Sequence, residues 1–253
     1  MVYPEVDYPS EPVAPTPPQN SAAFLLALEN SDAEIPSLEQ LPLNSVNHAH
    51  KIFDLYHPDA DWLKEAIFGS GLARLYCYGF ITITHNKQGA FVERWHKETS
   101  YFHFLVGEMM ITLDDVAFLL HLPIRGRLLN HSQITHDVTT KWMVDYLGAQ
   151  LEKAYEQYSL TDGAHAKFSF LKDLYHDHLV METDCETRGD DFFVQYHCQC
   201  ALRCYFMLLF GTSLFVDKSA NYVDATYLRY FMDLDTVREW NWGPAIWDPY
   251  TKR

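Results

Sequence analysis

The 253-residue sequence is poor in cysteine and glycine and has no long apolar run, and each shortage excludes a class of protein. Five unevenly spread cysteines are an odd number, so they predict no disulfide framework and favour a reducing compartment. The longest apolar run, residues 204–210, is far short of the roughly 20 residues that a membrane-spanning helix needs. With 11 glycines and no Gly-x-Gly-x-x-Gly motif, the sequence offers no nucleotide-binding loop.

Positive charge is scarce too: the sequence has 19 lysines and arginines but 34 aspartates and glutamates, which gives a formal net charge of −15. A surface this acidic repels phosphate, which argues against a general nucleic-acid coat protein or a binder of anionic membranes. The N-terminus lacks the basic and apolar regions of a secretory signal, so we expect a soluble intracellular chain. Hydrophobic residues still make up 48% of the sequence, which is enough for one large core.

Proline divides the chain into a tail and a globular part. Six of the 12 prolines fall within residues 4–18, where no helix or central strand tolerates them. We therefore expect residues 1–45 to form an extended tail with one short apolar helix at residues 21–28, and residues 46–253 to form one domain. The short helix either docks on that domain or binds a partner.

Local patterns in the globular part predict a mainly helical fold. We expect two helices within residues 53–68, split at Pro58, one helix over 140–158, a short one over 168–175, and one over 193–210 that ends at Gly211. The acidic residues 182–191 are typical of a solvated loop. Strand content is limited to residues 80–84 and a hairpin, so the expected class is mainly α with a small β component (α+β), with one or two short hairpins.

The densest set of signals lies between residues 91 and 127. Residues 91–95 predict a helical turn, and residues 100–104 and 109–112 predict a hairpin that turns at 106–108. Thr112 and Asp115 then fit a capping box. The helix that follows should bury Leu113, Val116, Leu119 and Leu120 and end at Leu122-Pro123. We expect Trp95, Phe102, Val116 and Leu120 to form one buried cluster between hairpin and helix.

Matching blocks from about residue 71 to residue 243 resemble the plant mobile domain, the "aminotransferase-like" domain of maintenance-of-meristems-like proteins. The motif residues are Arg94, Trp95, Glu98, Thr99, Phe102, His103, Gly107, Glu108, Thr112, Leu113, Asp115, Val116, Leu120, Leu122, Pro123, Gly126, Trp242 and Gly243. The resemblance implies a non-enzymatic nuclear protein that interacts with other proteins and is linked to meristem maintenance, development and the silencing of genes and transposons. Some members carry a serine/threonine phosphatase domain, whose metal-binding motifs are absent from this sequence.

Three departures from the family pattern affect these expectations. Ser100 stands where the family often has histidine, and Leu105 where it usually has proline. After Trp242-Gly243 the family continues into a helix, which Pro244 and Pro249 should break, so we expect a C-terminally incomplete domain. Apolar side chains there would lack cover, and the chain would self-associate or need a partner. These side chains are Trp240, Trp242, Ile246 and Trp247.

Two histidine-containing clusters could in principle hold a metal. His197, Cys200 and Cys204 share one helical face, which suits zinc, although buried structural thiols without metal are the favoured interpretation. Residues 175–178, Tyr-His-Asp-His, could bind metal or shuttle protons, but a solvated helix end is favoured because positions two apart point in different directions.

Two charged clusters complete the candidates. Glu93, Arg94, Glu98 and His103 could form a site, but we favour an ion-pair lattice that fixes the hairpin. Arg125 and Arg127 follow a unit resembling half of a helix-turn-helix and could meet phosphate. The neighbouring sequence lacks a basic, polar reading face, which argues against direct DNA binding.

We therefore predict no catalytic residue, no cofactor and no bound metal. No lysine stands in a recognisable setting for pyridoxal phosphate, and no nucleophile–base pair has a recognisable spacing. The alternative is a transposon-derived DNA-binding or transferase-like enzymatic domain. The expected location is the nucleus by resemblance, otherwise the cytoplasm, since the sequence shows no import signal. The expected partners are nuclear proteins or a second copy, with no membrane.

Overall fold

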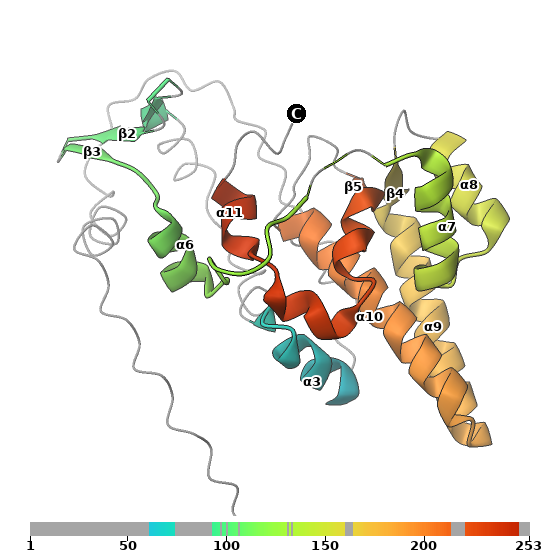
Figure 1. The fold of residues 1–253 in the computed structure, drawn as a ribbon. Coiled ribbons are helices and arrows are strands. Elements are labelled where there is room, and N and C mark those ends of the chain that lie inside the picture. Colours follow the sequence, from blue (N-terminus) through green and yellow to red (C-terminus); the bar gives the residue numbers. More distant parts are fainter. Residues whose placement is uncertain are drawn as a thin grey trace, which may run out of the picture.

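The structure is a computed structural model, and it describes residues 61–73, 93–159 apart from 97, 100, 106, 131 and 133, 164–213 and 221–247 (Figure 1). Its elements are mainly helical, with two small antiparallel sheets, and this confirms the predicted class. The predicted tail, the helix before Pro58 and the strand at 80–84 lie outside the described residues. The second predicted helix of that pair is present as α3 (Asp61–Gly69).

Two long antiparallel helices, α9 (Phe168–Arg188) and α10 (Asp191–Ser213), form the centre of the fold. Most core contacts involve α10, which touches α3, α7, α9 and β5. The prediction of a short helix followed by an acidic loop is wrong, because α9 continues to Arg188. No glycine or proline interrupts it before Gly189, whose left-handed conformation (φ 71°) ends the helix, and its acidic side chains are mostly on the solvent side.

Gly211 lies inside α10 and does not end it, contrary to expectation. A Cβ at this position would come within 2.8 Å of Val223 and of the Phe168 ring. Val223 belongs to β5 (Tyr222–Asp224), which pairs with β4 (His165–Lys167) in a two-stranded sheet that the sequence did not predict. The glycine therefore serves close packing of this sheet against the helix.

The single helix predicted over 140–158 is two helices in the structure. They are α7 (His136–Leu147) and α8 (Leu151–Ser159), separated at Gly148. Gly148 adopts a left-handed conformation (φ 64°), and its N–H donates to the carbonyl of Met143. The apolar spacing continues across the break, which is why periodicity alone did not reveal it.

The predicted hairpin is confirmed as β2 (Tyr101–Phe104) and β3 (Gly107–Met109). Phe104 pairs with Gly107, so the second strand begins at Gly107, inside the predicted turn, and ends at Met109, where it was predicted to begin. Trp95 lies in a third strand, β1 (Trp95–His96), where a helical turn was predicted.

The capped helix is confirmed as α6 (Leu113–Leu120). The Thr112 side chain accepts a hydrogen bond from the Asp115 N–H at 3.1 Å, and the Asp115 carboxylate accepts one from the Thr112 N–H at 2.7 Å. His121, in a left-handed conformation, ends the helix two residues before Pro123. Val116 is buried, whereas the three leucines of the predicted face are half-buried.

After β5 the chain forms two 3-10 helices and a final short helix. These are η2 (Ala225–Tyr230), η3 (Leu234–Glu239) and α11 (Trp242–Trp247). The expectation that Pro244 breaks the last helix is wrong, because proline is tolerated in the first turn, where the backbone N–H groups have no helical partner. Helix α11 contacts α6, so the two ends of the family motif meet.

Candidate functional site

The segment after α6 lies beside the segment between η3 and α11, and we call this contact the motif junction (residues 122–130 with 237–243). Arg127 N–H donates to the Glu239 carbonyl at 2.8 Å, and Asn241 N–H donates to the Arg127 carbonyl at 2.9 Å. Gly243 N–H donates to the Pro123 carbonyl at 2.8 Å. Residues more than 100 positions apart are thus joined through their backbones.

Two motif glycines allow this close approach. Gly126 has φ 138°, and a Cβ there would collide with the Glu239 carbonyl oxygen. A Cβ at Gly243 would lie 2.6 Å from Cγ2 of Ile124. Both positions therefore require glycine for space, and Gly126 requires it for conformation as well.

Trp242 anchors the junction in the core. Its side chain is 0% exposed, and its indole N–H donates to the Val237 carbonyl at 2.9 Å. Its ring lies 4.5 Å from that of Phe210 and stacks on Phe231 at 5.8 Å. The expectation that Trp242 lacks cover is wrong, because α10 and η2 surround it. Trp240 is half-buried, and the side chains of Ile246 and Trp247 lie outside the described residues.

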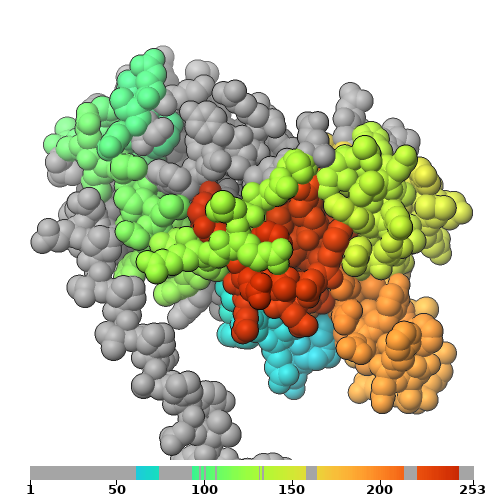
Figure 2. Space-filling view, viewed as in Figure 1, coloured from blue at the N-terminus to red at the C-terminus, as the bar shows by residue number. Residues whose placement is uncertain are grey.

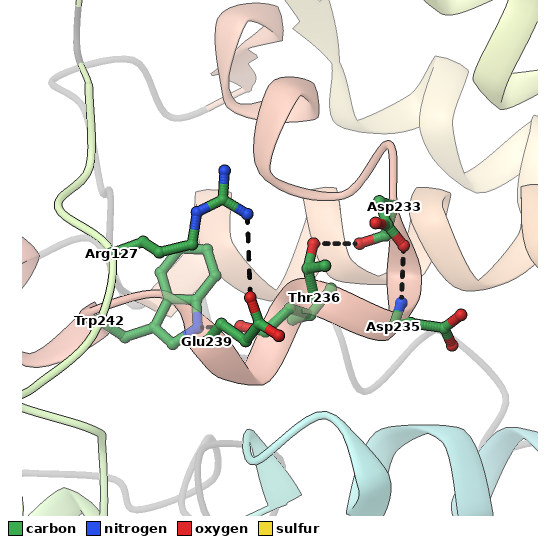
Figure 3. A network of polar contacts seen from close by, with 7 residues as sticks. Arg127, Asp233, Asp235, Thr236, Glu239 and Trp242 are labelled. Atoms are coloured by element: carbon green, nitrogen blue, oxygen red, sulfur yellow. Dashed lines mark hydrogen bonds and ion pairs between the residues drawn. The ribbon is translucent and has the colours of Figure 1, made fainter.

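Charged and polar groups of the junction face one another at the surface (Figure 3). The Arg127 guanidinium lies 4.3 Å from the centre of the Trp240 ring and 3.9 Å from the Glu239 carboxylate. Asp233 caps η3, since its carboxylate accepts the Asp235 N–H at 3.2 Å. Arg127, a candidate phosphate contact that the sequence did not favour, makes cation–π and ionic contacts within the chain.

Arg229 and Tyr230 hold the end of the same segment. Arg229 donates to the carbonyls of Asn130 and Ser132 at 2.6 Å each, and the Tyr230 hydroxyl donates to the Asn130 carbonyl at 2.7 Å. Burial raises the pKa of Tyr230 to about 12, so this hydroxyl stays a donor. Sequence patterns gave no signal for either residue, because their partners lie about 100 positions away.

The hairpin end of the motif is more exposed than expected. Trp95 contacts Phe102 with ring centres 4.8 Å apart, but Trp95 is 40% exposed and Phe102 only half-buried. Of the four residues in the predicted buried cluster, Val116 is buried, Phe102 and Leu120 are half-buried and Trp95 is exposed, so the prediction of one buried cluster is wrong. Of the four residues in the predicted lattice, His103 lies 3.3 Å from Glu108 across the hairpin.

His197 and His178 form a contact that neither predicted cluster contained. Their Nδ1 atoms are 2.9 Å apart, and Nε2 of His178 is 2.9 Å from the Leu147 carbonyl. A carbonyl can only accept, so His178 carries its proton on Nε2 and accepts at Nδ1 from Nδ1–H of His197. The solvated helix end predicted for residues 175–178 is wrong, because these residues lie in the middle of α9 and His178 is buried.

Burial shifts the pKa values of the thiols and imidazoles of this region toward their neutral forms. It raises the pKa of Cys198 to about 11 and also raises those of Cys200 and Cys204. It lowers the pKa of His178 and His197. Thiols with raised pKa values are weak nucleophiles at neutral pH. Within the described residues, no group of three metal-ligating side chains is arranged to hold an ion.

Arg203 is a buried cation that sequence patterns did not single out. It donates to the carbonyls of Phe231 and Met232 at 3.0 Å each, where η2 ends. Carbonyls at a helix end lack helical partners, so the guanidinium satisfies them and ties η2 to α10.

Described residues line two hollows of the surface. One of about 580 Å³ lies among α3, α10 and η3, and its charged lining residues are Asp235 and Arg238. The other, of about 290 Å³, lies between α8 and α9 and is lined by Lys153, Lys167 and Asp173, among others. Neither hollow is lined by an imidazole or a thiol, and the smaller one is lined by Ser169 together with carboxylates and lysines. Among the described helices, none is long and apolar enough to cross a membrane.

The chain belongs to the plant mobile domain family, whose model matches residues 71–247. It is 33% identical to Protein MAIN-LIKE 2 of Arabidopsis thaliana over 62% of this chain and 21% of the relative. It is 28% identical to Protein MAINTENANCE OF MERISTEMS over 70% of this chain and 33% of that protein. It is also 27% identical to Serine/threonine-protein phosphatase 7 long form homolog, over 82% of this chain and 14% of that protein.

The chain thus spans a third or less of the length of these relatives, and all three are from Arabidopsis thaliana. No solved structure matches the chain. The family assignment confirms the resemblance drawn from the motif residues, and it relates the chain to meristem maintenance-related proteins.

Proposed function

We propose that this domain is a non-enzymatic module that binds other proteins in the nucleus, in processes related to meristem maintenance, development and the silencing of genes and transposons. The biological context is proposed from the relatives, one of which is named for the maintenance of meristems. The molecular role is proposed from the way that the domain uses its polar groups.

One observation carries the proposal: buried polar side chains in the described fold form hydrogen bonds with backbone groups. Asp115 caps α6, Arg203 holds the end of η2, His178 binds the α7 carbonyl end, and Trp242 binds η3. A catalytic site needs such groups to converge on a space that substrate can enter. Groups bound to backbone stabilise a surface, and a stable surface is what an interaction module presents.

A DNA-binding or enzymatic domain is the alternative, and two observations weigh against it. Arg127 and Arg229 are engaged within the chain, and the net charge of −15 opposes approach to phosphate. The relative named as a phosphatase matches over only 14% of its length, so its printed activity belongs to a protein with much further sequence.

The test uses the full chain as bait in extracts of plant nuclei, with an unrelated protein of similar negative charge as the control bait. We expect specific protein partners, a nuclear signal from a fluorescent fusion, and no aminotransferase, phosphatase or nuclease turnover from the purified chain. Turnover in any of these assays that is lost on mutation of the chain, together with an absence of specific partners, would contradict the proposal.

A further inference from the structure

The C-terminal end of α9 and the N-terminal end of α10 project together from the described structure (Figures 1 and 2, orange). They carry large apolar side chains that are exposed to solvent. We call this projection the arm (residues 176–197). Its exposed apolar side chains are Val180, Met181, Phe192, Phe193 and Tyr196. Phe192 is 74% exposed and Val180 is 69% exposed. Single exposed apolar residues are ordinary, but a group of five on one helical hairpin is typical of an interaction surface.

The aromatic side chains of the arm form a continuous row. Phe192 contacts Phe193 with ring centres 5.4 Å apart, and Phe193 lies 6.5 Å from the His197 ring. Tyr196 lies 5.2 Å from His197 and 6.3 Å from His178. The row therefore runs along α10 from the tip of the arm to the histidine pair. The hydrogen bond between these two histidines joins α9 to α10 at the end of the row.

The charge of the arm is almost wholly negative. The carboxylates of the arm are Asp177, Glu182, Asp184, Glu186, Asp190 and Asp191. The basic residue among them is Arg188, which is paired with Asp184 at 3.2 Å. Two copies of such a surface would repel each other, whereas a basic segment would gain attraction to the carboxylates beside its apolar contacts.

We infer that the arm binds an amphipathic helix of a partner protein, with its apolar stripe on the aromatic row and its lysines or arginines against the flanking carboxylates. This inference rests on the proposed function, because it names the surface through which the module acts. A partner helix presents apolar side chains at positions i, i+3/i+4 and i+7, a spacing that suits a linear row of rings. Aromatic side chains are the groups that contribute most at such contacts.

The test measures fluorescence anisotropy of two labelled helical peptides of about 18 residues, a length at which helices are stable enough to compare. One has a leucine stripe flanked by lysines, and the other has the same stripe flanked by glutamates. The full chain should bind the lysine peptide and not the glutamate peptide. The double variant Phe192→Ser/Phe193→Ser should bind it at least about tenfold more weakly.

Matched controls distinguish specific binding at the arm from nonspecific apolar contact and from nonspecific electrostatic attraction. Leu105→Ser and Leu128→Ser remove other highly exposed leucines, and both should leave binding unchanged. Glu186→Lys should weaken binding, whereas Glu65→Lys, which makes the same charge change on α3, should have a smaller effect. Circular dichroism of each variant confirms that the fold is retained.

Several outcomes would overturn the inference. They are absence of binding by the wild-type chain, equal binding by the Phe192/Phe193 variant, equal binding of both peptides, or sedimentation showing that the arm joins two copies. The nuclear bait experiment keeps the proposed function distinct. If the arm variant captures the same nuclear partners as the wild type, the arm inference fails while the proposed function stands.

Discussion

At the residue scale, the motif junction depends on two glycines that local sequence rules do not explain. Neither Gly126 nor Gly243 ends a helix, yet each faces backbone or a side chain at a distance that a Cβ would violate. In both cases the room for a side chain is limited by a segment of the chain that lies more than 100 positions away in the sequence. A glycine in a motif can therefore report a long-range contact, which only the folded chain reveals.

We expect Gly126→Ala to destabilise the domain by about 2–4 kcal/mol, because it combines an unfavourable φ of 138° with a collision at the Glu239 carbonyl. Urea unfolding followed by tryptophan fluorescence measures this change. Gly69→Ala is the control, since a Cβ at Gly69 has no neighbour within 4 Å, and it should change stability by less than about 1 kcal/mol. Equal effects of the two substitutions would show that the junction does not need this glycine.

His197, Cys200 and Cys204 are predicted to bind no metal. A zinc ion bound there would have to deprotonate two thiols whose pKa values burial has raised. Elemental analysis after dialysis should find well under one zinc per chain, and chelator should leave the melting temperature unchanged. One retained zinc per chain that is lost in His197→Ala would contradict this expectation.

At the element scale, the sequence predicted those elements whose signals are local. The capping box at Thr112 and the hairpin at residues 101–109 were found because each is specified by a few neighbouring residues. Helix lengths were less accurate. The break at Gly148 lies within a continuous apolar period, and the acidic second half of α9 resembles a loop in composition although nothing in it interrupts a helix.

The candidate sites were harder to predict than the elements, because their contacts join distant segments. His178 and His197 lie on different helices, and the partners of Arg203 and Arg229 are backbone carbonyls, which have no sequence signature. The burial of Trp242 likewise results from contacts with Phe210 of α10 and Phe231 after η2. The periodicity of the sequence does not show that these segments lie beside Trp242.

The cap of α6 provides a test at this scale. Thr112→Ala should cost about 1 kcal/mol of unfolding free energy, because it removes the hydroxyl that accepts from the Asp115 N–H. Thr112→Ser keeps that hydroxyl and should retain most of the stability. Chemical denaturation measures both variants. If serine loses as much stability as alanine, the threonine methyl group and not the cap is what matters.

At the scale of the whole molecule, the domain combines a tightly bonded centre with an exposed acidic arm. The motif junction joins the hairpin end of the chain to α10, and α10 continues without interruption into the arm. The histidine pair belongs to the arm, and it connects α9 to α10 and to the end of α7. The protonation state of this pair therefore affects how the three helices are held together.

The stability of the domain should fall as the pH drops below about 6.5, the ordinary pKa of histidine in the unfolded chain. Burial lowers the folded-state pKa of His178, and burial and the His178 charge lower that of His197. Between pH 6.5 and those lower values the unfolded chain binds more protons, so acid favours unfolding. The slope approaches about 1.4 kcal/mol per pH unit for each excess proton. A doubly protonated pair would also bring two N–H donors together at 2.9 Å.

Urea unfolding between pH 7.5 and pH 5 measures this slope, and the range avoids most carboxylate titration. His178→Gln should reduce the slope, because it removes the buried histidine of the pair. His176→Gln changes an exposed histidine two residues earlier on the same helix and should leave the slope as it is in the wild type. If both variants retain the full slope, the acid sensitivity comes from groups outside the histidine pair, and the pair has no part in coupling pH to the packing of the arm.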